Sequence, residues 1–281
     1  MRITCLVDNT SRRSSCLWAE HGLAFLIEAD TGRVLFDTGQ SGTVLMHNLD
    51  ELEIDPGVID ALAISHAHYD HTGGLPALLE RTSPGLPLYA HPDLFRKRFS
   101  QRRGEPAPKE TGLSLAQEAL ASRTTLHLSA EPQEILPGIW TTGEITSRPD
   151  PEGRSSRHLV RAGTGWASDP YYDDMSLVLA MDVGSVLLCG CCHAGLLNTL
   201  SHVARTFKRS VTAVVGGTHL VSADAHHLQR VCKVMAEMES LRRLYLNHCS
   251  GEDALYALRL TLGLNAVRSC PAGTELDEEA L

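Results

Sequence analysis

The chain has 281 residues, of which 43% are hydrophobic and 21% charged, and it carries a formal charge of −9 at pH 7. This composition excludes a disordered chain, because the apolar content is ordinary, and the acidic balance excludes general affinity for nucleic acid or an anionic membrane. The most apolar stretch, residues 175–192, contains Asp182 and two glycines, and so falls short of the ~18–20 apolar residues that span a bilayer.

The first third of the chain predicts alternating strands and helices. Two apolar segments flank a turn that contains Gly32 and predict a hairpin. Val44, Leu45 and Leu49 are spaced to share one helical face. The expected strands are 3–7, 23–28, 33–36, 59–64 and 87–90, and the expected helices are 41–52 and one beginning at 75–79.

Prolines, glycines and a basic run (residues 96–103) mark the middle of the chain, so residues 92–170 predict an irregular insert or lid. Regular patterning then returns, with an amphipathic helix expected over 225–238. The remaining expected strands are 176–181, 185–189, 211–215 and 244–246. Alternating strands and helices on both sides of the insert predict a single α/β domain over 1–281, with sheets covered by helices.

The N-terminal ten residues lack the apolar segment and cleavage site of a secretory signal. We therefore expect a cytoplasmic protein whose eight cysteines are reduced thiols or metal ligands. The oligomeric state is left open, a homo-oligomer included.

Residues 66–71, HAHYDH, carry the strongest chemical pattern. They follow an expected strand and precede an expected helix. Side chains two apart on an extended chain point the same way, so His66 and His68 can reach one metal ion, while Asp70 and His71 emerge beyond the turn and can address a second. Gly73 and Gly74 allow close backbone packing beneath the site.

This motif resembles the His-x-His-x-Asp-His motif of the metallo-β-lactamase superfamily. Further segments occur in order and resemble the dihydropterin-ribofuranosylaminobenzene-phosphate synthase-like metal-dependent hydrolases of that superfamily. They are CLVDN (5–9), EHGL (20–23), LFDTG (35–39), DD (173–174), GCCHAG (190–195), GGTHL (216–220) and NHCSG (247–251). The resemblance implies an αββα sandwich of two mixed sheets with metals at one edge.

The resemblance also implies roles for residues outside the motif. Asp37 matches a residue that orients a ligand histidine, and His248 matches the last metal-binding histidine. Where the superfamily commonly has an aspartate that bridges two metals, this chain has Cys191. His193, Asp174 and Cys191 remain alternatives for completing the site, in that order, and Cys191 and Cys192 can equally be buried apolar residues.

Other candidates lie at strand ends or on basic segments. His219, after two glycines, is a candidate substrate contact or proton donor, and His21 a candidate substrate contact. The histidine pair 226–227 is expected to be solvated or packed. The basic run 96–103 is expected to be an exposed face, with a phosphate-gripping lid as the alternative.

These residues predict a hydrolase with two divalent metal ions, zinc first and manganese or iron as alternatives. The ions would activate a hydroxide toward a small anionic substrate, phosphorylated or of ester type. Asp70 is expected to ligate metal and orient the hydroxide. One alternative is a synthase that joins a pterin to an aminobenzene-ribose-phosphate, and another is an iron protein with a redox function.

Overall fold

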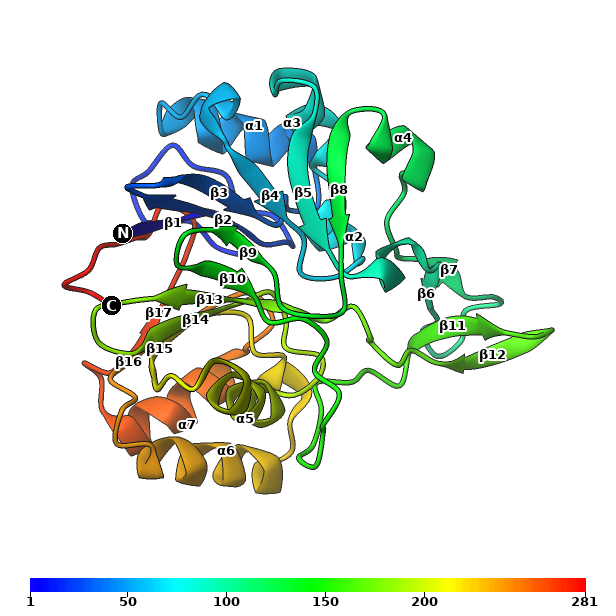
Figure 1. Ribbon diagram of the computed structural model, residues 1–281. Coiled ribbons are helices and arrows are strands. Elements are labelled where there is room, and N and C mark those ends of the chain that lie inside the picture. Colours follow the sequence, from blue (N-terminus) through cyan, green and yellow to red (C-terminus); the bar gives the residue numbers. More distant parts are fainter.

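The computed structural model describes residues 1–281 and consists of two seven-stranded sheets packed face to face between helices (Figure 1). This is the layered sandwich that the sequence predicts. The first sheet runs in the order β18 (Glu275–Leu276), β1 (Arg2–Val7), β2 (Ala24–Ala29), β3 (Gly32–Phe36), β4 (Ala61–Ala63), β5 (Leu86–Ala90) and β8 (Thr124–Leu128).

The second sheet contains four parallel neighbours, β14, β15, β16 and β17, whose carboxyl ends lie at one edge. Its full order is β17 (Val267–Ser269), β16 (Arg243–Leu246), β15 (Val211–Gly216), β14 (Ser185–Cys189), β13 (Ser176–Ala180), β10 (Ile139–Thr141) and β9 (Glu134–Leu136).

Three apolar layers follow from the alternation of side chains along the strands. In β2, Phe25 and Ile27 face the second sheet, whereas Leu26 faces the helices outside. A third layer joins the outer face of the second sheet to its helices. The helices are α1 (Gly42–Glu51) and α3 (Leu75–Arg81) on the first sheet, and α5 (Leu196–Phe207), α6 (Ala225–Glu237) and α7 (Glu252–Leu262) on the second.

The middle of the chain is more regular than its composition predicts. The irregular insert expected over 92–170 instead contributes β8 to the first sheet and β9 and β10 to the second. Its remaining strands form a separate four-stranded sheet: β12 (Gly165–Ser168), β11 (His158–Ala162), β6 (Arg98–Ser100) and β7 (Lys109–Glu110). These strands have two to five residues, too few to show a periodic pattern.

Other differences from the sequence expectations are small. Of the strand expected over 59–64, only β4 forms. A short 3₁₀ helix, Pro56–Val58, precedes it and has Ile59 as its C-terminal cap. The remaining elements are two short α-helices, α2 (Tyr69–Thr72) and α4 (Gln117–Ala121), and two more 3₁₀ helices, Pro92–Phe95 and Leu220–Ser222. None of the helices has the length and apolar character needed to cross a membrane.

The basic run does not form a uniformly exposed face, as the sequence analysis expected. The Arg98 side chain is 1% exposed and its guanidinium pairs with Asp93, Asp169 and Asp173. Asp173 also accepts a hydrogen bond from the backbone N–H of Ala67 at 2.8 Å. Arg98 therefore ties the four-stranded sheet to the loop that holds the histidine motif.

Candidate metal centre

The histidine motif begins in the loop after β4 and continues into α2. Nε2 of His66 lies 3.0 Å from Nδ1 of His68, and the ring nitrogens of both can group with one from His193, all within 4.8 Å. Burial, and then neighbouring imidazoles, hold the pKa values of these three histidines well below the usual range. They are therefore neutral, which is the form that binds cations.

Asp70 and His71 lie on α2, beyond the turn. Oδ2 of Asp70 is 3.2 Å from Nε2 of His21, 3.5 Å from Nε2 of His248 and 3.9 Å from Nε2 of His71. Asp70, His21 and His248 form a second donor group. Asp70 thus belongs to a different donor group from His66 and His68, whereas His71 groups with His66 and Cys191.

Asp37, which follows β3, supports the motif from below. It accepts hydrogen bonds from the backbone N–H and hydroxyl of Ser65, each at 2.7 Å, and from Nδ1 of His71 at 2.6 Å. Burial lowers the pKa of His71, but Asp37 outweighs it and raises that pKa to about 9. The sequence analysis expected Asp37 to orient a ligand histidine, and its position fits this role.

The glycine pair after the motif allows a close backbone approach. A Cβ at Gly73 would lie 2.0 Å from the carbonyl oxygen of Gln40, and one at Gly74 would lie 2.1 Å from that of Thr38. Any side chain at either position would push the motif away from β3 and its Asp37.

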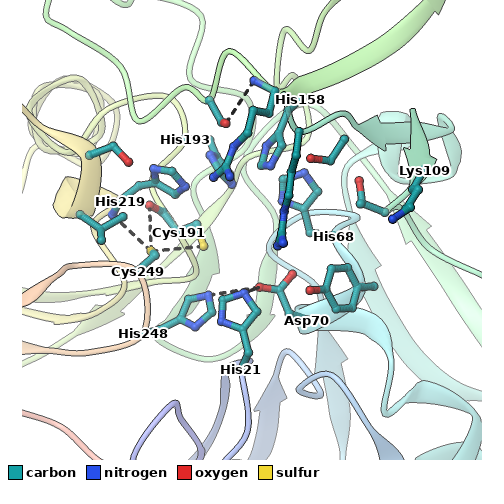
Figure 2. Close-up of a pocket in the computed structure, with 18 of the residues that line it drawn as sticks. His21, His68, Asp70, Lys109, His158, Cys191, His193, His219, His248 and Cys249 are labelled. Carbon is teal, nitrogen blue, oxygen red and sulfur yellow. Dashed lines mark hydrogen bonds and ion pairs between the residues drawn. The ribbon is translucent and has the colours of Figure 1, made fainter. Parts of the chain in front are cut away.

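The second sheet brings its donors from the ends of three parallel strands. His193 follows β14, His219 follows β15, and His248 with Cys249 follows β16. His219 and His248 have φ angles of 48° and 50°, a left-handed conformation that is uncommon for non-glycine residues. Figure 2 shows these side chains converging on the motif from the opposite side of a cavity.

The three alternatives for completing the site occupy different places. His193 joins His66 and His68, whereas Sγ of Cys191 lies 3.3 Å from Nε2 of His71. Asp174 belongs to no donor group. Its Oδ2 accepts the backbone N–H of Ala194 at 2.9 Å. Its Oδ1 is buried without a partner. Asp174 thus supports the loop that carries His193 through one oxygen and leaves the other free, and the three residues stay alternatives in the predicted order.

The two candidate substrate contacts border the same cavity. The His219 ring lies 4.4 Å from that of His193, and the half-exposed His21 lies against Asp70. The paired histidines 226 and 227 lie at the start of α6 and do not line the cavity.

The orientation of the histidines tests whether the site suits a cation. Nδ1–H of His193 donates to the carbonyl oxygen of Gly153 at 2.8 Å, and Nδ1 of His248 lies 3.0 Å from Oδ1 of Asn9. With Nδ1 held in this way, Nε2 carries the free lone pair. Nε2 of His68 and of His193 are buried and have no partner in the protein. Buried unpaired nitrogens are costly, so this arrangement fits a bound metal ion.

The cavity of about 490 Å³ is also lined by residues that the sequence analysis missed. His158 lies at its wall with Nδ1 2.8 Å from the hydroxyl of Tyr171, whose ring stacks on His193. Cys249 lies 3.3 Å, sulfur to sulfur, from Cys191. Burial raises the pKa of Cys249, but Cys191, His248 and His219 outweigh it and lower it to about 5. The position of Cys249 beside His248 in NHCSG was the available signal.

Comparison with known proteins agrees with this geometry. The model of the metallo-β-lactamase superfamily matches residues 17–191. A 7,8-dihydropterin-6-methyl-4-(β-D-ribofuranosyl)-aminobenzene-5′-phosphate synthase of Methanocaldococcus jannaschii is 30% identical over 267 residues, which cover 90% of this chain and 89% of the relative.

Two solved structures extend the comparison. Tm1679, described as a metal-dependent hydrolase of the β-lactamase superfamily, aligns over 99% of this chain and 98% of its own, with 27% identity and a TM-score of 0.83. Zinc-bound PqqB from Methylobacterium extorquens covers 99% of this chain and 100% of its own at 12% identity and a TM-score of 0.60, a likeness of fold alone. The predicted fold and family resemblance are confirmed.

Proposed function

The chain belongs to the metallo-β-lactamase superfamily, and from this premise we propose that it is a metal-dependent hydrolase of a small anionic substrate, phosphorylated or of ester type. The observation that carries the proposal is the pair of buried, unpartnered Nε2 atoms on His68 and His193, which come from opposite sheets and face one cavity. Tm1679, which is similar over its whole length, is named as a metal-dependent hydrolase.

Two sets of residues would hold divalent cations, zinc first and manganese or iron as alternatives. His66, His68 and His193 would hold one cation, and Asp70, His71 and His248 the other. Divalent cations in such sites act as Lewis acids and lower the pKa of coordinated water toward neutrality.

The protein's own groups orient the ligands and meet the substrate. Asp37 fixes the ring of His71, so that its Nε2 faces Asp70 and Cys191. Asp70 is the one carboxylate in the donor groups and would orient the attacking water. His219 lines the cavity and would bind the substrate anion or protonate the leaving group.

Cationic residues on the four-stranded sheet and its loops support an anionic substrate. Arg102, Lys109 and Arg157 line the cavity. Lys109 is paired with Glu105 at 2.8 Å, whereas the guanidinium groups of Arg102 and Arg157 have no acidic partner. The cavity volume of about 490 Å³ lies within the range that holds small ligands. An unpaired guanidinium matches the geometry of phosphate or carboxylate oxygens.

Metal removal and an activity screen test this function together. We expect the purified protein to contain divalent metal by elemental analysis and to hydrolyse a phosphodiester, phosphomonoester or lactone. Chelation should abolish the activity, and added Zn²⁺ or Mn²⁺ should restore it. Full activity in the metal-free protein would contradict the proposal.

The relative from M. jannaschii favours a second candidate function, a synthase that joins a pterin to an aminobenzene-ribose-phosphate, because its name describes such a product. Incubation with a pterin diphosphate and an aminobenzene ribose phosphate, followed by mass spectrometry, separates the two candidates. A condensed product with release of diphosphate supports the synthase, and hydrolysis without condensation supports the hydrolase.

A further inference from the structure

Two cysteines from different strands meet inside the candidate metal centre. Cys191 follows β14 and Cys249 follows β16, and their sulfur atoms are 3.3 Å apart. A disulfide bond would require about 2.05 Å, so the two are separate thiols. Both line the cavity beside the histidines (Figure 2).

The sheet is built to let these sulfurs approach. Because β15 lies between β14 and β16, their backbones are about 9–10 Å apart, two strand spacings. The chain leaving β15 has glycine at position 217, where a Cβ would lie 2.7 Å from Sγ of Cys249 and 2.3 Å from the carbonyl oxygen of Gly190. The missing side chain at this position leaves the space in which the thiols meet.

The sulfurs lie among the nitrogen donors of both predicted cation positions. Cys191 groups with His66 and His71 on one side, and with His248 and Cys249 on the other, in each case within 4.8 Å. Its sulfur is 3.3 Å from Nε2 of His71. Cys191 is therefore common to two donor groups.

Two divalent cations in this site would also need more negative charge than its carboxylates supply. Asp70 is the single carboxylate in the donor groups, and two divalent cations carry four positive charges. Both oxygens of Asp37 are engaged with Ser65 and His71, and Asp174 belongs to no donor group. The backbone N–H of His219 donates to Sγ of Cys249 at 3.2 Å, so this sulfur is held in place as an acceptor inside the cavity.

We propose that Cys191 and Cys249 are thiolate ligands of this metal centre, with Cys191 shared between its two cation positions. Each thiol gives up its proton to solvent as the cation binds, so no oxidant takes part. Thiolates favour thiophilic cations, so the pair makes the centre selective for Zn²⁺ over Mg²⁺ and Mn²⁺. The inference rests on the proposed function only in that it takes a bound cation as given.

The spectrum of the protein loaded with Co²⁺ alone tests the thiolate ligands. Sulfur bound to Co²⁺ gives an intense charge-transfer band in the near ultraviolet, which nitrogen and oxygen ligands do not give. We expect this band in the unmodified protein, a weaker one in Cys191→Ala and Cys249→Ala, and none in the double variant.

Cys192 provides a matched control from the same loop. It belongs to no donor group, and its side chain packs into the apolar layer beneath the outer helices, so Cys192→Ala should keep the full band. A Co²⁺-loaded protein without the band overturns the inference even if every variant fails to fold. A Cys191–Cys249 disulfide in the metal-loaded protein, detected by mass spectrometry without reductant, also overturns it.

Cys191→Asp tests metal selectivity. A carboxylate at this position still supplies a negative charge, so metal should bind. The preference for Zn²⁺ over Mn²⁺ should fall about tenfold or more, which is the size of change in affinity that substitutions around a metal site cause. An unchanged preference contradicts the inference. A cobalt–sulfur band without any hydrolysis would overturn the hydrolase and leave the thiolate site standing, whereas hydrolysis without the band would do the reverse.

Discussion

The two sheets supply the metal-centre donors in different ways. The first sheet supplies His66, His68, Asp70 and His71 from one continuous segment after β4, the loop and α2. The second sheet supplies them one or two at a time from the loops after β14, β15 and β16, which lie far apart in sequence. We call the donor-bearing ends of the two sheets the first and second edges. The first edge is a local structure, whereas the second exists only once three parallel strands are in register.

Left-handed backbone conformations occur at both edges but are more frequent at the second. At the first edge Asp37, beneath the motif, has a φ of 60°. At the second edge φ is 55° at Cys192, 48° at His219 and 50° at His248. Such strain persists only where the surrounding structure enforces it, and at the second edge the parallel strands do so. Changes to the second edge therefore depend more on the whole fold.

The largest expected effect comes from removing one donor from each edge. His68→Ala and His193→Ala should each abolish hydrolysis and lower the metal content measured by elemental analysis, because the two nitrogens face the same position. His226→Ala, on the exposed start of α6, is the control. If one variant lost its metal and the other kept it, the two edges would not share a cation.

Arg98 tests how strongly the four-stranded sheet is held to the loop that carries the first edge. Arg98→Ala leaves Asp169 and Asp173 buried without their cation, so the free energy of unfolding should fall by about 3–5 kcal/mol. Urea denaturation measures this. Arg161→Ala, which removes cation–π contacts with Trp166 and Phe99, should cost less than about 1 kcal/mol. Equal losses would mean that the buried network does not stabilise the fold.

The contrast between the edges explains what the sequence could reveal. Residues 66–71 place their ligands by local geometry, and a strand followed by a turn suffices to predict them. His193, His219 and His248 were singled out because each ends an apolar strand, or because the family resemblance marked them. The strand pattern and that resemblance also predicted the layered sandwich.

What the sequence could not reveal depends on packing between distant segments. Asp174 and Cys191 were ranked from the motif alone, but their roles depend on which side chain faces His71 and which accepts the N–H of Ala194. The burial of Arg98 needed partners 71 and 75 residues further along the chain. His158 and Tyr171 lie on short segments of the middle region, where no periodic pattern marks an element.

Asp37 tests how the first edge orients its histidine ligands. Asp37→Asn keeps the size of the side chain but removes the negative charge that holds His71 and Ser65. Metal affinity, measured by competition with a chelating dye, should fall about 10–100-fold. Asp55→Asn, which changes the cap of a short helix away from the site, should leave it unchanged. An unaltered affinity in Asp37→Asn would show that Asp37 does not orient the ligand.

The smallest expected effect falls on substrate binding and is confined to the four-stranded sheet. Arg157 lines the cavity without an acidic partner. Arg157→Ala should therefore raise KM for an anionic substrate about tenfold while kcat stays within about twofold. The effect on KM is modest because a charge-assisted contact with an exposed group contributes only about 1–2 kcal/mol to binding. The KM of the unmodified protein should rise with salt more steeply than that of the variant, because screening weakens the same contact. Arg161→Ala, on the same sheet but over Trp166, should change neither. A fall in kcat at constant KM would instead place Arg157 in the reaction itself, and the division between donors on the two large sheets and substrate contacts on the small one would fail.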